Sequence, residues 1–158
     1  MQEAQLYFGS TLETRETFHE VRNPYTGELV TKRADSTKED ALRMLEIAKS
    51  AKKAAKYSTL AQRINWLEDV ARKLVEQKES VALTLTHETA KPIAFARIEV
   101  ERCIETIRIT AATMMTMAGE TINTDAMPSG KKTEAYFKRE PAGVIVAITP
   151  FNFPLNLV

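Results

Sequence analysis

Glycine and cysteine are both scarce in this chain of 158 residues. The 5 glycines stand far apart, so neither GxGxxG nor a Walker loop can be written, which excludes a glycine-rich phosphate site. The single cysteine, Cys103, rules out an internal disulfide, and with only 2 histidines beside it no plausible zinc ligand set exists. The sequence therefore predicts a metal-free protein from a reducing, intracellular compartment.

An excess of one charge sign and long apolar runs are also missing. The 22 Lys and Arg residues balance 21 Asp and Glu for a formal net charge of +1, which lacks the basic excess of nucleic-acid binders. No apolar run approaches the roughly 18 residues needed to span a bilayer. The first residues, MQEAQLYFGS, do not resemble a signal peptide. We expect a cytoplasmic protein that binds neither nucleic acid nor a membrane.

The patterns that are present indicate a helix-rich chain of the α/β class. Short strands are predicted at 6–9 and 28–32, with a turn at 23–27 between them. Apolar residues at helical spacing predict four helices, at residues 37–55, 60–77, 80–89 and 92–118. Ser36 and Glu39 match a capping box before the first helix, and Gly119 is the predicted left-handed cap of the last one.

Beyond Gly119 the pattern changes to extended pieces. An exposed turn region at 120–132 is followed by a predicted strand at 133–139. The continuous apolar run at 144–148 is typical of a parallel strand buried on both faces. Such a strand needs a crossover helix and a neighbouring strand, yet only ten residues follow it. We therefore expect the front part of a larger enzyme, or a truncated product.

The longest predicted helix carries two apolar lines. The core face consists of the residues within about 40° of Val100 around the helix: Ile93, Val100, Ile104, Ile107, Ala111 and Met114. A second line on the opposite side contains Phe95, Ile98 and Ile109. Arg102 falls within that second line. It either pairs with an internal carboxylate or extends to water, or it forms a fork for the carboxylate or phosphate of a substrate.

Two further side chains are candidates for chemistry. Asn152 follows the apolar strand at its carboxyl end, where open α/β sheets bind ligands. It is either an ordinary turn residue or a rigid amide that donates to a developing oxyanion. Cys103 lies at the edge of the core face with nothing nearby to lower its pKa, so we interpret it as a structural thiol.

Four motifs together resemble the aldehyde dehydrogenase superfamily. Residues 139–144 read REPAGV and residues 148–155 read ITPFNFPL, similar to the family block EPxGVxxxIxPWNFPL. Residues 23–28, NPYTGE, resemble the family's NPxTGE turn. Residues 88–92, ETAKP, resemble its E-x-GKP segment, with Ala90 where glycine is commoner. The resemblance covers nearly the whole chain but only about the first third of a family member.

The resemblance implies roles for the residues around Asn152. It makes Asn152 the oxyanion-stabilising amide of an NAD- or NADP-dependent enzyme that oxidises an aldehyde through a cysteine thiohemiacetal, with Phe153 beside it among the substrate-binding residues. It places four residues in the nicotinamide side of the cofactor cleft: Ile148, Thr149, Pro150 and Phe151. The nucleophilic cysteine and the general base of the family would lie beyond Val158, so the chain alone is expected to be inactive.

The resemblance also narrows the substrate and suggests an assembly. Phe151, where tryptophan is more general, resembles the branch of lactaldehyde and non-phosphorylating glyceraldehyde-3-phosphate dehydrogenases. In the latter an arginine at the position of Arg102 contacts the substrate phosphate, which implies an anionic aldehyde. The expected division is 1–118 as a mostly helical part of the cofactor-binding domain, 119–141 as an oligomerisation hairpin, and 142–158 as the start of a Rossmann-like parallel sheet.

The family is usually dimeric or tetrameric, so a homo-oligomer is expected, with Tyr136 and Phe137 facing a partner subunit. A different class of function is also open. In that alternative the chain is a non-catalytic helical domain that binds a partner through its exposed strand and hairpin, because unpaired strand edges invite pairing.

Overall fold

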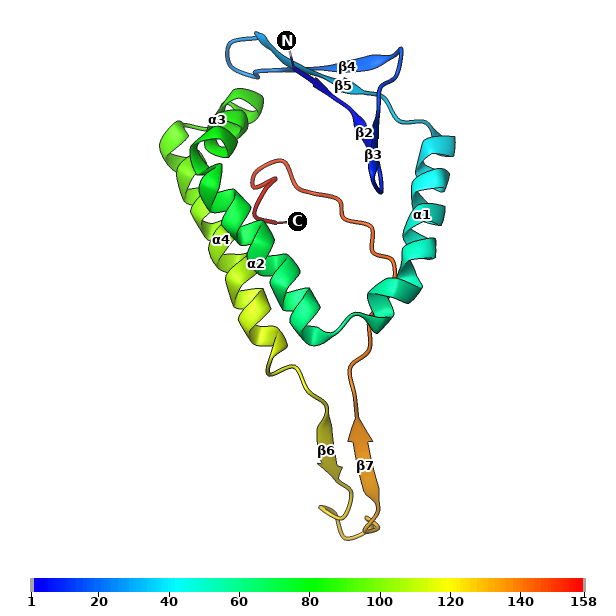
Figure 1. Ribbon diagram of the computed structural model, residues 1–158. Coiled ribbons are helices and arrows are strands. Elements are labelled where there is room, and N and C mark those ends of the chain that lie inside the picture. Colours follow the sequence, from blue (N-terminus) through cyan, green and yellow to red (C-terminus); the bar gives the residue numbers. More distant parts are fainter. Residues whose placement is uncertain (1, 158) are drawn as a thin grey trace.

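The computed structural model describes residues 2–157. Small sheets lie at one end, helix α1 stands apart from the packed helices α2, α3 and α4, and a long hairpin projects at the opposite end (Figure 1). In chain order the elements are β1 (Gln2–Ala4), β2 (Leu6–Phe8), β3 (Thr11–Glu13), β4 (Phe18–Arg22), β5 (Leu29–Ala34), α1 (Lys38–Tyr57), α2 (Leu60–Glu76), α3 (Lys78–Thr89), α4 (Ile93–Met114), β6 (Glu120–Asn123) and β7 (Glu134–Phe137).

The N-terminal sheet is built around β5, which pairs in parallel with β1 and antiparallel with β4. Strands β2 and β3 form a separate antiparallel hairpin. The predicted strands at 6–9 and 28–32 correspond to β2 and β5. Strands β1, β3 and β4 were not predicted, because the short sequences QEA, TLE and FHEVR hold too few apolar residues to show an alternation.

The turn at 23–27 is confirmed, and it also ties the sheet to α3. Asn23 Oδ1 accepts hydrogen bonds from the amides of Tyr25 and Thr26, each at 2.9 Å. Its Nδ2 donates to the carbonyl of His87 at 2.8 Å. Gly27 has φ 74°, a conformation that glycine adopts without strain. The sequence NPYTGE thus fixes the position of the end of α3 against the sheet.

The capping of α1 differs by one residue from the prediction. Thr37, not Ser36, is the N-cap, and its side chain forms a reciprocal capping box with Asp40 rather than Glu39. Asp40 takes this place because its carboxylate also accepts a hydrogen bond from Arg15 Nη2 at 2.5 Å. A second capping box, between Thr59 and Gln62, starts α2. The predicted start of this helix after residues 58–59 is therefore confirmed.

Helices α2, α3 and α4 share the hydrophobic core. Its buried members are Ala71, Ala82, Leu85, Ala96, Val100 and Ile104. Small alanines let the helix axes approach closely, and Val100 is fully buried. The predicted core face of α4 is therefore confirmed, while Phe95, Ile98 and Ile109 of the second line are exposed.

The predicted cap at Gly119 is wrong. Helix α4 ends at Met114, with Met115 as its C-cap, and Gly119 is not among the described glycines with positive φ. It begins the β6–β7 hairpin instead. A Cβ added there would lie 1.8 Å from the carbonyl oxygen of Phe137, so the glycine permits the close approach of the two strands.

The predicted strand at 144–148 is not formed. Residues 141–150 have no regular structure, and Ile145, Val146 and Ile148 are 76%, 78% and 90% exposed. A strand requires hydrogen bonds from a neighbour, and within residues 2–157 none lies beside this run. The alternative hypothesis of a non-catalytic domain needs an exposed strand to bind its partner. That strand is therefore also not formed.

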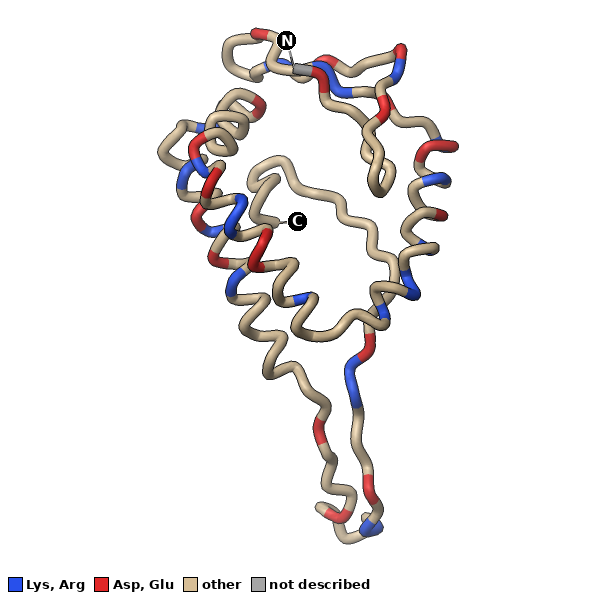
Figure 2. Tube along the Cα trace, in the orientation of Figure 1, with Lys and Arg blue, Asp and Glu red and all other residues tan. Residues whose placement is uncertain are grey.

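Charges of both signs are interspersed along the helices, and the segment after Glu140 carries none (Figure 2). Across residues 2–157 none of the helices has the length and apolar character to cross a bilayer. The same residues contain no cluster of three or more His, Cys, Asp or Glu side chains able to hold a metal ion.

Candidate functional site

The motif NFPLN forms a tight turn that docks on α4. Residues 151–157 are a succession of bends and turns. Leu155 packs against the shared helical core, and Thr106 Oγ1 lies 3.2 Å from Asn156 Oδ1, to which it donates a hydrogen bond. Residues 152–156 are called the docked turn below.

A buried ion pair lies beneath the docked turn. Lys91 comes from the short connection between α3 and α4, and Glu99 from the second turn of α4. The Glu99 side chain is 0% exposed and that of Lys91 is 15% exposed. Lys91 Nζ donates to Glu99 Oε2. A buried carboxylate is strongly unfavourable unless it is paired and hydrogen-bonded, so the lysine is required for Glu99 to lie here.

The ion pair binds the backbone of the docked turn. Lys91 Nζ also donates to the carbonyl oxygen of Asn152 at 2.7 Å. Glu99 Oε1 accepts from the amide of Leu155 at 3.0 Å and from that of Asn156 at 3.4 Å. Hydrogen bonds to charged groups are stronger than neutral ones. One ion pair thus holds three backbone groups of a five-residue turn.

Asn152 is an exposed residue whose side chain carries a primary amide. Within residues 2–157 its amide makes no hydrogen bond, so both donor hydrogens are available to a ligand. The predicted location at the carboxyl end of a strand is not observed, because residues 144–148 form no strand. Lys91 and Glu99 instead hydrogen-bond the backbone of the turn that carries Asn152.

Arg102 lies on the same side of α4 as the docked turn. Its guanidinium carbon is 5.9 Å from the centre of the Phe153 ring, and Lys91 Nζ is 4.5 Å from that ring, both within the range of cation–π contacts. Arg102 is exposed and forms no ion pair within residues 2–157. The internal carboxylate considered for it is therefore not observed, and the guanidinium is open to an anion from solution.

Three of the four residues assigned to the cofactor cleft are exposed, and Pro150 is half-buried. Ile148 and Phe151 are 90% and 98% exposed, and Thr149 and Pro150 lie between them. Apolar side chains without cover suit one face of a planar ring. Because the chain has no glycine-rich phosphate loop, these residues do not by themselves make a complete dinucleotide site.

Cys103 has the properties of a structural thiol. It is buried and free, and its Sγ lies 3.6 Å from the carbonyl oxygen of Leu155, to which it donates. Burial raises the pKa of the Cys103 thiol, and the nearby negative charge of Glu99 raises it further. A protonated thiol is a weak nucleophile, so this cysteine does not fill a catalytic role.

Sequence reasoning missed Glu99 as a site residue. The available signal was its position on α4: at 100° per residue, Glu99 lies about 100° from Val100, between the core face and the second apolar line. A carboxylate flanked by two apolar lines calls for a buried partner. Lys91 belongs to the ETAKP motif, but its partner is eight residues away on another element.

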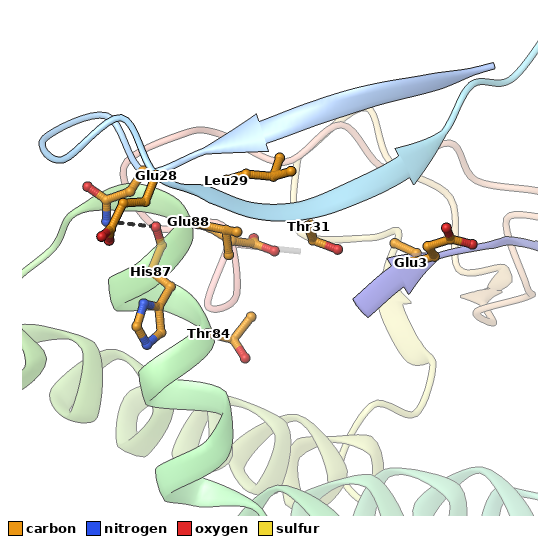
Figure 3. Close-up of a pocket in the computed structure, with 10 residues that line it drawn as sticks. Glu3, Glu28, Leu29, Thr31, Thr84, His87 and Glu88 are labelled. Carbon is orange, nitrogen blue, oxygen red and sulfur yellow. Dashed lines mark hydrogen bonds between the residues drawn. The ribbon is translucent and has the colours of Figure 1, made fainter. Parts of the chain in front are cut away.

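A hollow of about 460 Å³ lies between β5 and α3 (Figure 3). Three carboxylates line it, from Glu3, Glu28 and Glu88, together with His87. None of the site residues predicted from the sequence lines this hollow. It is therefore separate from the candidate site at residues 148–153.

Comparisons with known proteins agree with the motifs. Residues 11–158 match the family model described as the aldehyde dehydrogenase family. The chain is 37% identical over 138 residues to a lactaldehyde dehydrogenase of Methanocaldococcus jannaschii, covering 87% of this chain and 28% of the relative. It is 34% identical over 139 residues to aspartate-semialdehyde dehydrogenase 1 of Pseudomonas canavaninivorans, covering 88% of this chain and 30% of that relative.

Solved structures give the same result for the fold. The chain superposes with a TM-score of 0.89 and 32% identity on the NADP-dependent glyceraldehyde-3-phosphate dehydrogenase of Bacillus halodurans complexed with NADP, covering 99% of this chain and 34% of that one. Aldehyde dehydrogenase 21 of Physcomitrella patens, in complex with the reaction product succinate, gives a TM-score of 0.89 at 30% identity. This superposition covers 99% of this chain and 33% of that one. The chain spans about a third of the length of these relatives. Its α/β fold is that of the N-terminal part of such enzymes, and the chain belongs to the aldehyde dehydrogenase family.

Proposed function

We propose that the protein carrying this chain is an NAD(P)-dependent aldehyde dehydrogenase that oxidises an aldehyde to a carboxylic acid. The observation that carries the proposal is the docked turn, in which the Asn152 backbone is held by Lys91 while its side-chain amide is exposed and has no partner within residues 2–157. A fixed amide with free donor hydrogens is suited to stabilise negative charge on an attacked carbonyl oxygen.

In this proposal Asn152 donates to the oxygen that becomes negative when a thiolate attacks the aldehyde. The donor costs no reorganisation at that moment, because the turn is already fixed by its contacts with α4. The attacking thiolate comes from outside residues 1–158, since Cys103 is buried and its pKa is raised. The isolated chain should therefore show no aldehyde oxidation.

NAD or NADP is the proposed cofactor, and it would accept the hydride equivalent released by the substrate. Ile148, Thr149, Pro150 and Phe151 would contact its nicotinamide side. The exposed apolar surface of Ile148 and Phe151 supports this assignment, as does the NADP held by the Bacillus halodurans relative. What these residues contribute is an apolar wall that excludes water from the reacting centre.

We propose an anionic aldehyde as the substrate. The guanidinium of Arg102 is exposed, free of an acidic partner within residues 2–157, and beside Phe153 of the docked turn. Relatives named for aspartate semialdehyde and glyceraldehyde 3-phosphate support an anion at this place. In the full-length protein, Arg102→Leu should raise KM for an anionic aldehyde far more than for a neutral one. Equal increases would remove Arg102 from the substrate site.

The division into residues 1–118, 119–141 and 142–158 and a homo-oligomeric assembly belong to the same proposal. The two-stranded β6–β7 hairpin projects from the molecule (Figure 1), and Tyr136 on β7 is 74% exposed. Open strand edges and an exposed aromatic residue favour contact with another subunit. Light scattering of the full-length protein and of a Tyr136→Lys variant tests the assembly, and cell fractionation tests the expected cytoplasmic location.

The test of the proposed function is a direct activity assay. The full-length protein should reduce NAD or NADP in the presence of an anionic aldehyde, while residues 1–158 alone should not. Release of the carboxylic acid in amounts equal to the reduced cofactor would establish the reaction. A full-length protein that reduces neither cofactor with any aldehyde tried would refute the proposal.

A further inference from the structure

We infer that Glu99 and Lys91 are positioning residues for Asn152: their buried ion pair holds both ends of the docked turn and thereby sets the direction in which the Asn152 side chain leaves the backbone. The catalytic consequence of this inference rests on the proposed function. The structural part can be tested on the chain itself.

The contacts at the two ends of the turn are complementary. At its start, Lys91 Nζ binds the carbonyl of Asn152 at 2.7 Å, which fixes the peptide plane that immediately follows the Asn152 Cα atom. At its end, the amides of Leu155 and Asn156 converge on Glu99 Oε1 at 3.0 and 3.4 Å. With the carbonyl plane and the end of the turn both bound, the backbone torsion that aims the Asn152 side chain has little freedom left.

The ion pair is placed to act as a rigid support and not as a surface contact. Glu99 is fully buried on α4, which packs in the core with α2 and α3. Lys91 is held from a second side by the face of the Phe153 ring, 4.5 Å from its Nζ. By contrast, the side chains of the pair formed by Lys78 of α3 and Glu101 of α4 are 39% and 52% exposed. Only the buried pair contacts the docked turn.

Neither residue needs to contact the aldehyde for this effect. A displacement of about 1 Å at a reacting group can cost on the order of 10²-fold in rate. Loss of the carboxylate of Glu99 would free the end of the turn and leave the ammonium of Lys91 without its counter-ion. We therefore expect Glu99→Gln to lower kcat by about tenfold to 10²-fold, with KM for the cofactor changing less than about threefold.

The first experiment uses residues 1–158 and needs no activity. Amide hydrogen exchange is measured by NMR at Leu155 and Asn156, together with the relaxation of the Asn152 side-chain amide. Glu99→Gln should speed both exchange rates at least about tenfold and increase the mobility of the Asn152 amide, because the acceptor is weakened. Glu101→Gln is the matched control, an exposed glutamate on the same helix, and should change neither. Unchanged exchange and mobility in Glu99→Gln would overturn the inference.

The second experiment is a double-mutant cycle in the full-length protein. Because Glu99 is inferred to act through Asn152, Glu99→Gln should lower kcat in the wild-type background and change it less than about threefold in the Asn152→Ala background. An equal factor in both backgrounds would show a merely structural role and overturn the inference. If Glu99→Gln does not fold, Glu99→Asp, which keeps the charge and withdraws the oxygens, is measured with the same two expected and contrary outcomes.

The two experiments separate failure of the inference from failure of the proposed function. A full-length protein without dehydrogenase activity, or one indifferent to Asn152→Ala, would refute the proposed function. The exchange and relaxation measurements would then still decide whether Lys91 and Glu99 hold the Asn152 side chain.

Discussion

Removal of the ammonium of Lys91 should strongly destabilise the chain. In Lys91→Met the apolar stem is kept, so the main loss is the charge that faces Glu99, whose side chain is 0% exposed. Glu99 Oε1 keeps its two amide donors, but Oε2 loses its charged partner. Breaking a buried pair by removing one member costs about 3–5 kcal/mol. The free energy of unfolding should fall by about that amount.

Urea unfolding followed by the helical circular dichroism signal measures this change. With a slope of about 2 kcal/mol per molar urea, the midpoint should shift down by about 1.5–2.5 M. Lys78→Met is the matched control, since Lys78 forms an exposed pair with Glu101, and it should cost less than about 1 kcal/mol. The double variant Lys91→Met/Glu99→Leu should recover only part of the loss, because the unpaired charge is removed while the amides of Leu155 and Asn156 lose their acceptor. A loss below about 1 kcal/mol in Lys91→Met would refute the reasoning.

Three further predictions follow from individual residues. Ala90 has φ 55°, a left-handed conformation that costs a residue with a Cβ about 1–2 kcal/mol. Ala90→Gly should therefore raise the free energy of unfolding by about 0.5–1 kcal/mol, after subtraction of the greater backbone entropy that glycine loses on folding. A decrease would contradict this. Arg15 holds the pKa of Asp40 at about 2, below its ordinary 3.8. The stability due to this group is therefore present above pH 4 and lost between pH 4 and 2. The melting temperature of Asp40→Asn should fall less over this pH range than that of the wild-type chain, and identical profiles would contradict the prediction. Burial raises the pKa of the Cys103 thiol, and the charge of Glu99 raises it further. Glu99→Gln should therefore speed alkylation of this thiol at pH 8, and an unchanged rate would contradict a contribution from Glu99.

The sequence predicted the elements whose signals are local. The four helices follow from apolar spacing, and the start of α2 follows from Thr59, whose hydroxyl accepts from Gln62. The turn at 23–27 was predictable because its signals act within the turn itself. The Asn23 side chain accepts a hydrogen bond from the Tyr25 amide, and Gly27 supplies the positive φ. The family motifs then gave the α/β fold class, which the solved relatives confirm.

The features that sequence reasoning missed depend on contacts between distant residues. Thr37 replaced Ser36 as N-cap because Arg15, 25 residues from Asp40, helps to hold the capping carboxylate. Gly119 serves the approach of Phe137, which no local pattern reveals. The strand at 144–148 is absent because pairing needs a neighbouring strand.

The candidate site was predicted in part. Asn152 and Arg102 were predicted as site residues from their positions and from the family motifs, and the structure brings Phe153 of the docked turn next to Arg102. Glu99 was missed because its amide partners lie 56 and 57 residues away in the chain. A single carboxylate on a helix gives no sign of such a partner unless its neighbours on the helical wheel are considered.

The most direct test of the account is the effect of Asn152→Ala on the full-length protein. The account predicts that kcat falls by about 10²–10³-fold while KM for the cofactor is nearly unchanged. Asn156→Ala, in the other asparagine of the docked turn, removes a side chain whose oxygen contacts Thr106, and its loss should be far smaller. A fall of less than about threefold in Asn152→Ala, or equal losses in the two variants, would contradict the account.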